Sequence, residues 1–306
     1  MSHPALGPAA AEAAQWSWTL EPLVIVPVAV TAVVYVRGWI AVRTRLPERF
    51  GAARLAAFLA GLAALVVAVC PPLDALGHRW LRAHMAQHIV LMLIAPPLLW
   101  LGAPLAPLLS GLPRRLRRIV ATTLAGGPVR SVTGVLADPR VAWLTFAAAF
   151  WIWHLPAFYE LALAAEGWHR LEHACFVFAG LVFWWPVVAP WPSTRVWTSW
   201  AMVAYLVLAE AQAMVLSAIL TFADRVIYPS YATPAPSGHL SPIEDQALAG
   251  VLMWVPGSIP FTIALLALVF RGLSIQPRSP SLAAPPAATR PTATNGSTAT
   301  SSGERS

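Results

Sequence analysis

Apolar residues are concentrated in long stretches that short polar connections separate. A helix that crosses a bilayer needs about 20 predominantly apolar residues. Enough stretches reach this length to predict an all-α, polytopic membrane protein, a bundle of about seven transmembrane helices. The seven stretches are residues 22–41, 54–76, 85–109, 141–159, 170–190, 197–222 and 247–270.

One further stretch, residues 119–136, is moderately apolar but is interrupted by Gly126-Gly127-Pro128 and carries Arg130. Glycine and proline next to a charge are unfavourable within a span. We therefore predict an interfacial loop here, and the topology shifts if this segment crosses the membrane.

The predicted spans divide the chain into three parts. Residues 1–21 form a short outer N-terminal tail, residues 22–272 form the transmembrane domain, and residues 273–306 are rich in Pro, Ala, Ser and Thr. That composition predicts a disordered cytoplasmic tail. The first 20 residues carry Glu12 and no Arg or Lys, so a cleavable signal peptide is not expected.

Arginine placement predicts the orientation, because cytoplasmic connections are enriched in positive charge. With the N-terminus outside and the C-terminus in the cytoplasm, the arginines gather on the inner side. The inner connections and the tail hold Arg43, Arg45, Arg49, Arg114, Arg115, Arg117, Arg118, Arg130, Arg195, Arg271, Arg278 and Arg290. The outer connections hold Arg79, Arg82 and Arg225, balanced by Asp74, Glu160, Glu166, Asp224, Glu244 and Asp245.

Composition supports this placement. Apolar residues make up 58% of the chain and charged residues only 11%, far from the balance of soluble domains. The formal charge of +7 lies in short runs between spans. These runs act as topology determinants, so lipid is the expected environment and no nucleic-acid partner is implied. We expect a multi-pass protein of the bacterial cytoplasmic (inner) membrane.

The histidines are the main chemical feature, because the predicted topology puts all eight on or near the outer side. His84 and His88 are four residues apart, as are His169 and His173, so each pair shares one helical face. His154 lies near the outer end of another span. These five imidazoles could converge on a metal ion, with copper favoured over zinc. His3, His78 and His239 are expected to be merely solvated.

Methionines near one histidine pair refine the choice of metal. Met85 and Met92 fall on the same helical face as His88, and their thioethers would favour Cu(I). The alternative is that both only pack in the core.

Other polar groups inside the spans suggest partners or an ion path. Glu210 lies near the middle of a span, where a carboxylate is costly, and Met214 follows one turn later. The pair could line a path for a proton or cation, or Glu210 could only hydrogen-bond between helices. Further candidates for orienting the imidazoles or lining a path are Glu172, Asp245, Gln246 and Met253.

Motifs spread over four predicted helices carry a family resemblance. They are His84-Met85-Ala86-Gln87-His88, Ala95-Pro96-Pro97, Trp153-His154-Leu155-Pro156, His169-Arg170-Leu171-Glu172-His173 and Met253-Trp254-Val255-Pro256-Gly257. The chain resembles the multi-span assembly factors of caa3-type cytochrome c oxidase called CtaG. This resemblance implies a role in assembling a haem-copper oxidase, with the oxidase catalytic subunit and an extracytoplasmic (periplasmic) copper chaperone as expected partners.

Two other function classes stay open at this point. One is a multi-span copper transporter, in which Glu210 and Met214 would line the path. The other is a membrane metal-dependent hydrolase or oxygenase that uses an activated water. The sequence contains no nucleotide-binding loop, no GxSxG and no HExxH, so we expect a protein that is not an enzyme. Haem ligated by two histidines is a further alternative cofactor.

Overall fold

The computed structural model describes residues 22–193, 197–233 and 240–274. Every regular element among these residues is a helix, which confirms the predicted fold class. The predicted outer tail, most of the predicted cytoplasmic tail, and the two solvated histidines His3 and His239 lie outside the described residues.

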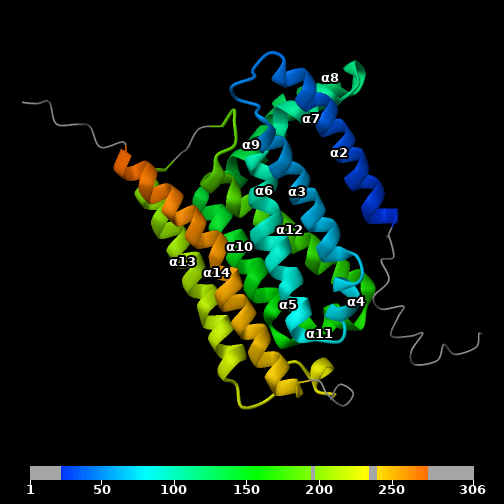
Figure 1. Ribbon diagram of the computed structural model, residues 1–306, viewed down its shortest axis with the longest axis vertical. Helices are drawn as coiled ribbons and strands as arrows, with labels where there is room; N and C mark the ends of the chain where they lie inside the picture. The colour runs from blue at the N-terminus through cyan, green and yellow to red at the C-terminus, as the bar shows by residue number, and fades with distance from the viewer. Residues whose placement is uncertain (1–21, 194–196, 234–239, 275–306) are drawn as a thin grey trace, which may run out of the picture.

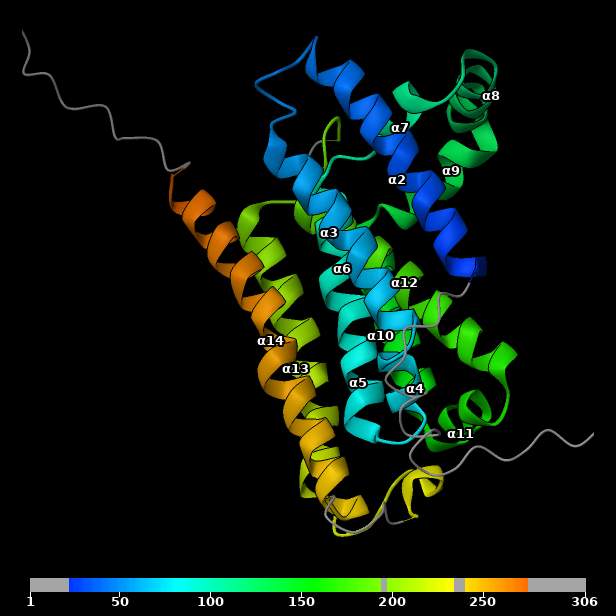
Figure 2. The same cartoon turned by 45° about the vertical axis from the view of Figure 1, so that its right-hand side comes forward.

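The helices form a bundle in which the long ones run lengthwise (Figures 1 and 2). The elements are α2 (Pro22–Arg43), α3 (Ala52–Val69), α4 (Leu73–Gly77), α5 (Leu81–Ile89), η1 (Val90–Ile94), α6 (Ala95–Leu101), α7 (Leu105–Gly111), α8 (Arg114–Ala125), α9 (Gly127–Leu136), α10 (Pro139–His154), α11 (Pro156–Ala164), α12 (Glu166–Val188), α13 (Ser199–Phe222), η2 (Pro229–Tyr231) and α14 (Pro242–Ser274).

Six of the described helical segments are long and apolar enough to cross a membrane, and up to eight are if each of two bent helix pairs counts as one span. The prediction of about seven lies within this range. Large apolar side chains such as Val33, Leu208 and Ile263 are exposed on the bundle surface, as expected where lipid covers the protein.

The two ends of the bundle differ in chemistry. Helices α4 and α11 and the start of α5 lie at one end, which we call the histidine end because His84, His154 and His169 are there (Figures 1 and 2). Helices α7 and α8 lie at the opposite end, which we call the basic end because α8 begins Arg114-Arg115-Leu116-Arg117-Arg118.

The interfacial loop predicted for residues 119–136 is wrong in its local structure. This segment belongs to two helices, α8 and α9, that meet at a bend of 66°. Gly126 is extended at the junction, and Pro128 lies in the first turn of α9, where its missing N–H costs nothing. Helix α8 has no buried residue, and Figure 1 places it at the basic end.

The fourth predicted span also differs, because it turns sharply at His154. Helix α10 ends at His154 and α11 begins at Pro156, with a bend of 72° between them. Proline lacks the N–H that would continue the hydrogen-bond ladder of α10. The bend therefore leaves His154 at an inner corner of the histidine end.

The third span is irregular directly after its histidines. Two successive prolines such as Pro96-Pro97 ordinarily break a helix, but α5 continues through the π-helix η1 into α6. Pro96 cannot donate to the carbonyl oxygen of Met92, and the indole Nε1 of Trp184 donates to that oxygen instead, at 3.1 Å. Gly180 allows this close contact, since a Cβ there would lie 2.7 Å from the same oxygen. The π-turn thus fixes α5 against α12.

Proline has a smaller effect in the last span, where Pro256 and Pro260 lie inside the continuous helix α14. Two hydrophobic clusters hold the bundle together. The smaller joins α2, α3 and α6, where Tyr35 donates to the carbonyl oxygen of Gly102 at 2.7 Å. The larger joins α5, α10, α12, α13 and α14 and surrounds the histidines.

Candidate metal centre

Imidazoles from three helices gather at the histidine end, and those of α5 and α12 surround one carboxylate. Helix α5 supplies one HxxxH pair, the end of α10 supplies one histidine, and the start of α12 supplies the second pair together with Glu172. The six side chains are buried, with exposed fractions of 0% for His84, 3% for His88, 4% for His154, 5% for His169, 0% for Glu172 and 7% for His173.

Glu172 lies at the centre of this group. Its Oε2 is 3.6 Å from Nε2 of His84, and its Oε1 is 3.5 Å from Nε2 of His88. Ligands around a tetrahedral ion with bonds near 2.0–2.1 Å are about 3.4 Å apart. Each of these two distances is therefore the spacing expected between two ligands of one ion.

The second histidine pair completes the set. One ligand atom from each of His84, His169, Glu172 and His173 lies within 4.8 Å of the others. The ring of His88 extends the group inward, with its centroid 5.3 Å from that of His154. We name these six residues the imidazole–carboxylate cluster.

The cluster has more buried polar atoms than partners for them. The Nε2 atoms of all five imidazoles and both carboxylate oxygens of Glu172 have no hydrogen-bond partner among the described residues. Burying such groups unpaired is unfavourable, and nearly all buried polar atoms in proteins are satisfied. Ligation of a cation would satisfy several of these atoms at once, so the donor set fits a transition metal.

Hydrogen bonds at the other ring nitrogens fix two of the tautomers. Nδ1 of His154 lies 2.7 Å from the carbonyl oxygen of Phe150, which can only accept, so this nitrogen carries the proton. Nε2 of His154 is then the lone-pair nitrogen. A metal-binding imidazole is oriented in this way when its far nitrogen donates to a backbone carbonyl.

His84 is oriented by a tyrosine from the connection between α13 and α14. The Tyr231 hydroxyl donates to the carbonyl oxygen of Gly77 at 2.5 Å and lies 3.2 Å from Nδ1 of His84. Burial raises the pKa of the Tyr231 hydroxyl above its ordinary value, so it keeps its proton. With that proton given to Gly77, the hydroxyl accepts from His84, which leaves Nε2 of His84 as the lone-pair nitrogen.

Methionine sulfurs border the inner side of the cluster. A cavity of about 30 Å³ is lined by His88 and His154 and also by Met85, Met92 and Met253. This is room for one ion or one water molecule. Met85 and Met253 were predicted near the histidines, and the structure places both at this cavity. Thioether and imidazole ligands together suit Cu(I).

Aromatic side chains close the inner side of the cluster. Deeper along α10 and α12, the Phe146 and Phe183 rings lie 4.3 Å apart, and Trp184 and Phe261 pack beside them. The structure therefore shows a polar site at one end of the bundle with an apolar core beneath it.

Two residues expected to orient imidazoles have other contacts. Asp245 accepts from the backbone N of Leu81 at 2.7 Å and forms an ion pair with Arg82, so it fixes the start of α5 rather than a histidine. Gln246 accepts from the backbone N of Ile227 at 2.7 Å and fastens the connection between α13 and α14. Both residues hold segments near the site in place, and neither hydrogen-bonds to an imidazole ring of the described residues.

The predicted path along α13 is not supported. Met214 is 41% exposed on the bundle surface, so it does not join Glu210 in a track through the interior. Glu210 is half-buried, and its Oε2 has no hydrogen-bond partner among the described residues. Of the predicted polar-path residues, only Glu172 lies in the imidazole–carboxylate cluster.

Sequence reasoning missed the tyrosines of the histidine end. Tyr159 of α11 stacks on Tyr228 at 3.9 Å between ring centroids, and the Tyr228 hydroxyl donates to the carbonyl oxygen of His154 at 2.9 Å. Burial raises the pKa of Tyr228. No spacing links Tyr228 and Tyr231 to the histidines, because they come from a connection distant in sequence.

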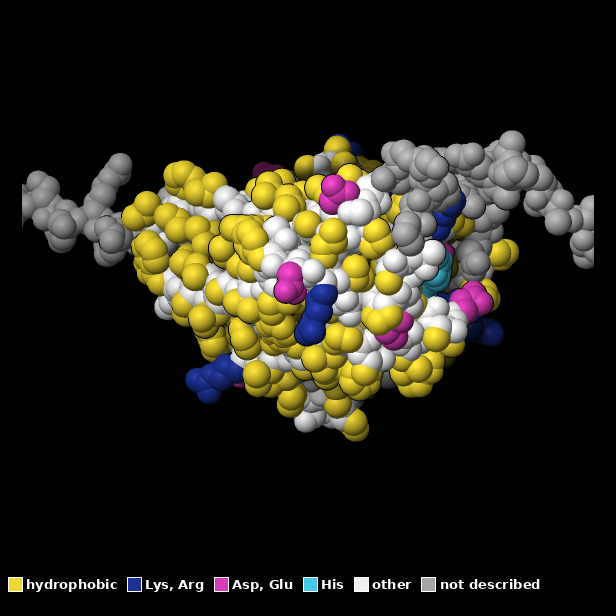
Figure 3. All heavy atoms as spheres, turned by 90° about the horizontal axis from the view of Figure 1, so that it is seen from below, with side chains coloured by type: hydrophobic (Ala, Val, Ile, Leu, Met, Phe, Trp, Pro, Cys, Tyr) yellow, Lys and Arg dark blue, Asp and Glu magenta, His cyan; other side chains and the backbone are white. Residues whose placement is uncertain are grey.

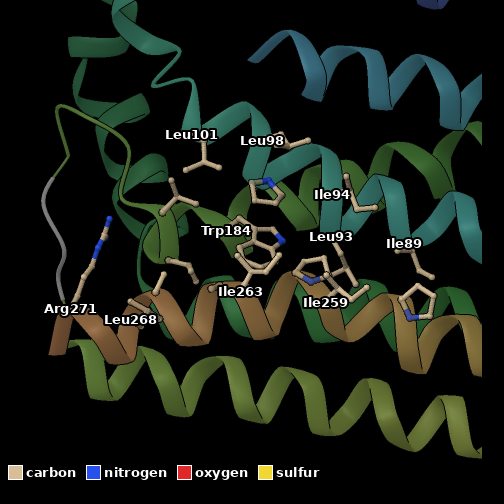
Figure 4. A pocket seen from close by; sticks show the side chains of 17 residues that line it. Ile89, Leu93, Ile94, Leu98, Leu101, Trp184, Ile259, Ile263, Leu268 and Arg271 are labelled. Carbon is tan, nitrogen blue, oxygen red and sulfur yellow. The ribbon is translucent and has the colours of Figure 1, made fainter. Parts of the chain in front are cut away.

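An apolar cavity of about 520 Å³ lies between the third span, α12 and α14, and shares Ile89 and Leu93 with the small cavity beside His88. Figure 4 shows its lining, with Leu98 and Leu101 facing Ile263 and Leu268, Trp184 between them, and Arg271 at one end. Its walls lack imidazoles and carboxylates. It is therefore not part of the metal centre.

Fold and site define a class: a multi-pass helical membrane protein with a buried imidazole–carboxylate cluster at one end. Residues 33–274 match the family described as cytochrome c oxidase caa3 assembly factor. The chain belongs to this family, as the motifs around His84, His154 and His169 implied.

Similar proteins occur in mycobacteria. The chain is 26% identical over 271 residues to an uncharacterized protein of Mycobacterium bovis and 24% identical over 261 residues to one of Mycobacterium leprae. Each alignment covers 82% of this chain and 39% of the relative, so the chain spans about two-fifths of the length of these relatives. No solved structure matches the chain.

Proposed function

We propose that this protein is a non-enzymatic assembly factor that binds copper at its histidine end and assists its delivery to the catalytic subunit of a haem-copper oxidase. Copper is the cargo in this proposal. Family membership supports the assembly role. The observation that carries the copper role is the gathering of buried, unpartnered Nε2 atoms of His84, His88, His169 and His173 around the equally unpartnered Glu172 carboxylate, with His154 beside His88.

The ligand types favour copper over zinc. The cluster offers imidazole nitrogens and one carboxylate, which both metals accept. The adjoining cavity adds the thioethers of Met85, Met92 and Met253, which favour Cu(I). A haem would need a much larger space between two histidines than the cavity of about 30 Å³ beside His88 and His154.

The site would face outward from a bacterial cytoplasmic membrane. The basic end carries the arginines of α8, which favour the cytoplasmic side. The histidine end is then extracytoplasmic, where an oxidase subunit or a soluble copper chaperone could exchange metal with it. An exposed histidine end would allow such exchange without carrying the ion across the bilayer.

The geometry favours assembly over the transport alternative. Transport needs a polar path from the cluster to the basic end, but Phe146, Phe183 and Phe261 pack together beneath the cluster. Met214, which was expected to line that path, is exposed on the bundle surface. A site confined to one end supports binding and hand-over.

The direct test is the copper content of the detergent-purified protein after anaerobic Cu(I) loading. We expect about one tightly bound copper in the wild type. The double variants His84→Ala/His88→Ala and His169→Ala/His173→Ala should both lose it, because each removes two ligands of the shared cluster. Asp224→Asn, which changes an exposed carboxylate between α13 and α14, is the matched control and should bind as the wild type does.

A complementation experiment in cells tests the delivery role. When each variant replaces the wild type in a host without its own copy, the double histidine variants should lower haem-copper oxidase activity and the copper content of its catalytic subunit. A wild-type protein that retains no copper would refute the copper role, and oxidase activity independent of all these histidines would refute delivery.

A further inference from the structure

His78, expected to be only solvated, lies against the imidazole–carboxylate cluster. It follows the short helix α4, and its ring centroid is 4.9 Å from that of His169. Asp74, in the first turn of the same helix, joins the two histidines. One ligand atom from each of Asp74, His78 and His169 lies within 4.8 Å of the others.

Burial increases stepwise across these residues. The side chain of His78 is exposed, that of Asp74 is half-buried, and His169 is buried. His78 is the one exposed histidine among the described residues. Figure 3 views the molecule from the histidine end and shows histidine atoms at the surface there.

His169 belongs to both groups of ligands. It completes the outer group with Asp74 and His78 and the inner group with His84, Glu172 and His173. Its Nε2 is buried without a hydrogen-bond partner among the described residues, and its side chain is 5% exposed. An ion held by the outer group would thus already contact one ligand of the cluster.

Asp74 is held in place by a buried amide. Gln87 of α5 donates from Nε2 to Oδ1 of Asp74 at 3.1 Å and to the carbonyl oxygen of Ala68 at 2.7 Å. Gly77 makes room for this amide, since a Cβ there would lie 2.2 Å from its Oε1. Gln87 therefore links the helix of the inner histidines to the carboxylate of the outer group.

We propose that Asp74, His78 and His169 form an entry site that captures a transition-metal cation from solution and passes it to the imidazole–carboxylate cluster. The destination rests on the proposed function, whereas the capture of a cation rests on these residues alone. With two imidazoles and one carboxylate at a partly exposed position, the entry site binds more weakly than the buried cluster. A negative carboxylate at the entrance also raises the rate at which a cation arrives.

The first experiment measures separately how fast copper is loaded and how much copper is bound. Cu(I) is offered anaerobically from a coloured chelator to the full-length purified protein, and transfer is followed by stopped-flow absorbance. His78→Ala and Asp74→Asn should bind the wild-type amount of copper but load it roughly ten-fold or more slowly. The amide oxygen introduced by Asp74→Asn would still accept from Gln87, so the packing of α4 is kept, and Asp224→Asn is the control of equal charge change.

The second experiment examines the entry site without the cluster. In the His84→Ala/His173→Ala variant, titration with Co(II) should show one weakly bound ion by its visible absorption, and adding His78→Ala should remove it. Wild-type loading rates in both entry variants would overturn the proposal while leaving copper binding intact. A wild type that binds no Cu(I) would overturn the proposed function, and Co(II) binding at His78 would then still establish the entry site.

Discussion

The Tyr231 hydroxyl lies 3.2 Å from Nδ1 of His84 and gives its own proton to the carbonyl oxygen of Gly77. The pair joins the connection between α13 and α14 to the helix that carries one HxxxH pair. Because the hydroxyl can only accept from His84, it selects the tautomer whose Nε2 faces Glu172. A residue distant in sequence thus sets the ligand state of the cluster.

Replacing Tyr231 with Phe should weaken Cu(I) binding without unfolding the protein. Partners that orient a metal-binding imidazole contribute about 10- to 100-fold to metal affinity. We expect a loss in this range, measured by competition with a Cu(I) chelator. Tyr228→Phe is the matched control, since its hydroxyl contacts the backbone of His154 and not a ring nitrogen. Equal affinities for Tyr231→Phe and the wild type would contradict the tautomer argument.

The carboxylate at the centre of the cluster makes a second prediction. Glu172→Gln keeps the shape of the side chain and removes its charge, so copper affinity should fall roughly ten-fold or more. The metal-free variant should melt at the wild-type temperature or above, because a neutral amide costs less to bury than an unpaired carboxylate. Competition with a Cu(I) chelator measures the copper affinity, and differential scanning calorimetry of the metal-free protein measures the melting temperature.

The control for this variant is Glu210→Gln, which changes a half-buried carboxylate within a span. Glu210 lies outside the cluster, so its variant should bind copper as the wild type does. A loss of copper affinity in Glu210→Gln similar to that in Glu172→Gln would show that charge anywhere in the bundle matters, and would argue against Glu172 as a ligand.

Much of the fold could be predicted from the sequence, because lipid imposes simple demands on length and polarity. The stretch 170–190 corresponds to α12 to within a few residues at each end. The failures occur where proline and glycine act locally. Pro156 turns one predicted span at His154. A π-turn, which was not predicted, precedes Pro96-Pro97, and there Trp184 donates to the carbonyl oxygen of Met92 in place of Pro96.

Only those features of the site that follow from the spacing of residues along one helix could be predicted. His84 with His88 and His169 with His173 each share a face because residues four apart do so in any helix. Which faces meet is decided by packing, so the central position of Glu172 was not evident. Short connecting segments escaped prediction altogether, which is why His78 was expected to be only solvated although it lies beside His169.

From the methionines at the small cavity we predict a preference for Cu(I) over Zn(II). Met85→Leu and Met253→Leu conserve volume, so both variants should fold with a stability change below about 1.5 kcal/mol. Removing a thioether beside His88 should weaken Cu(I) binding roughly ten-fold and leave Zn(II) binding unchanged, because zinc gains little from thioether ligands. Parallel titrations with the two metals measure this difference.

Met214→Leu is the control for that series, since its side chain is exposed on α13. It should bind both metals as the wild type does. If Met85→Leu and Met253→Leu also keep wild-type Cu(I) affinity, these methionines only pack in the core, which was the alternative open from the sequence.

The contact between α12 and the π-turn predicts that a single methyl group disturbs both stability and the site. A Cβ at Gly180 would lie 2.7 Å from the carbonyl oxygen of Met92 and 2.7 Å from Cγ of Pro96. Neither a backbone oxygen nor a proline ring can rotate away, so Gly180→Ala must push α12 from the third span. Overpacking of this kind costs about 1–3 kcal/mol. We expect a lower melting temperature in detergent, together with weaker copper binding, because Glu172 and His173 move with α12 away from His88.

Gly134→Ala is the control, because it places the same methyl group in α9 with nothing within 4 Å. This variant should melt at or above the wild-type temperature. A Gly180→Ala variant with wild-type stability and copper affinity would mean that the two helices can separate at this point without moving the cluster.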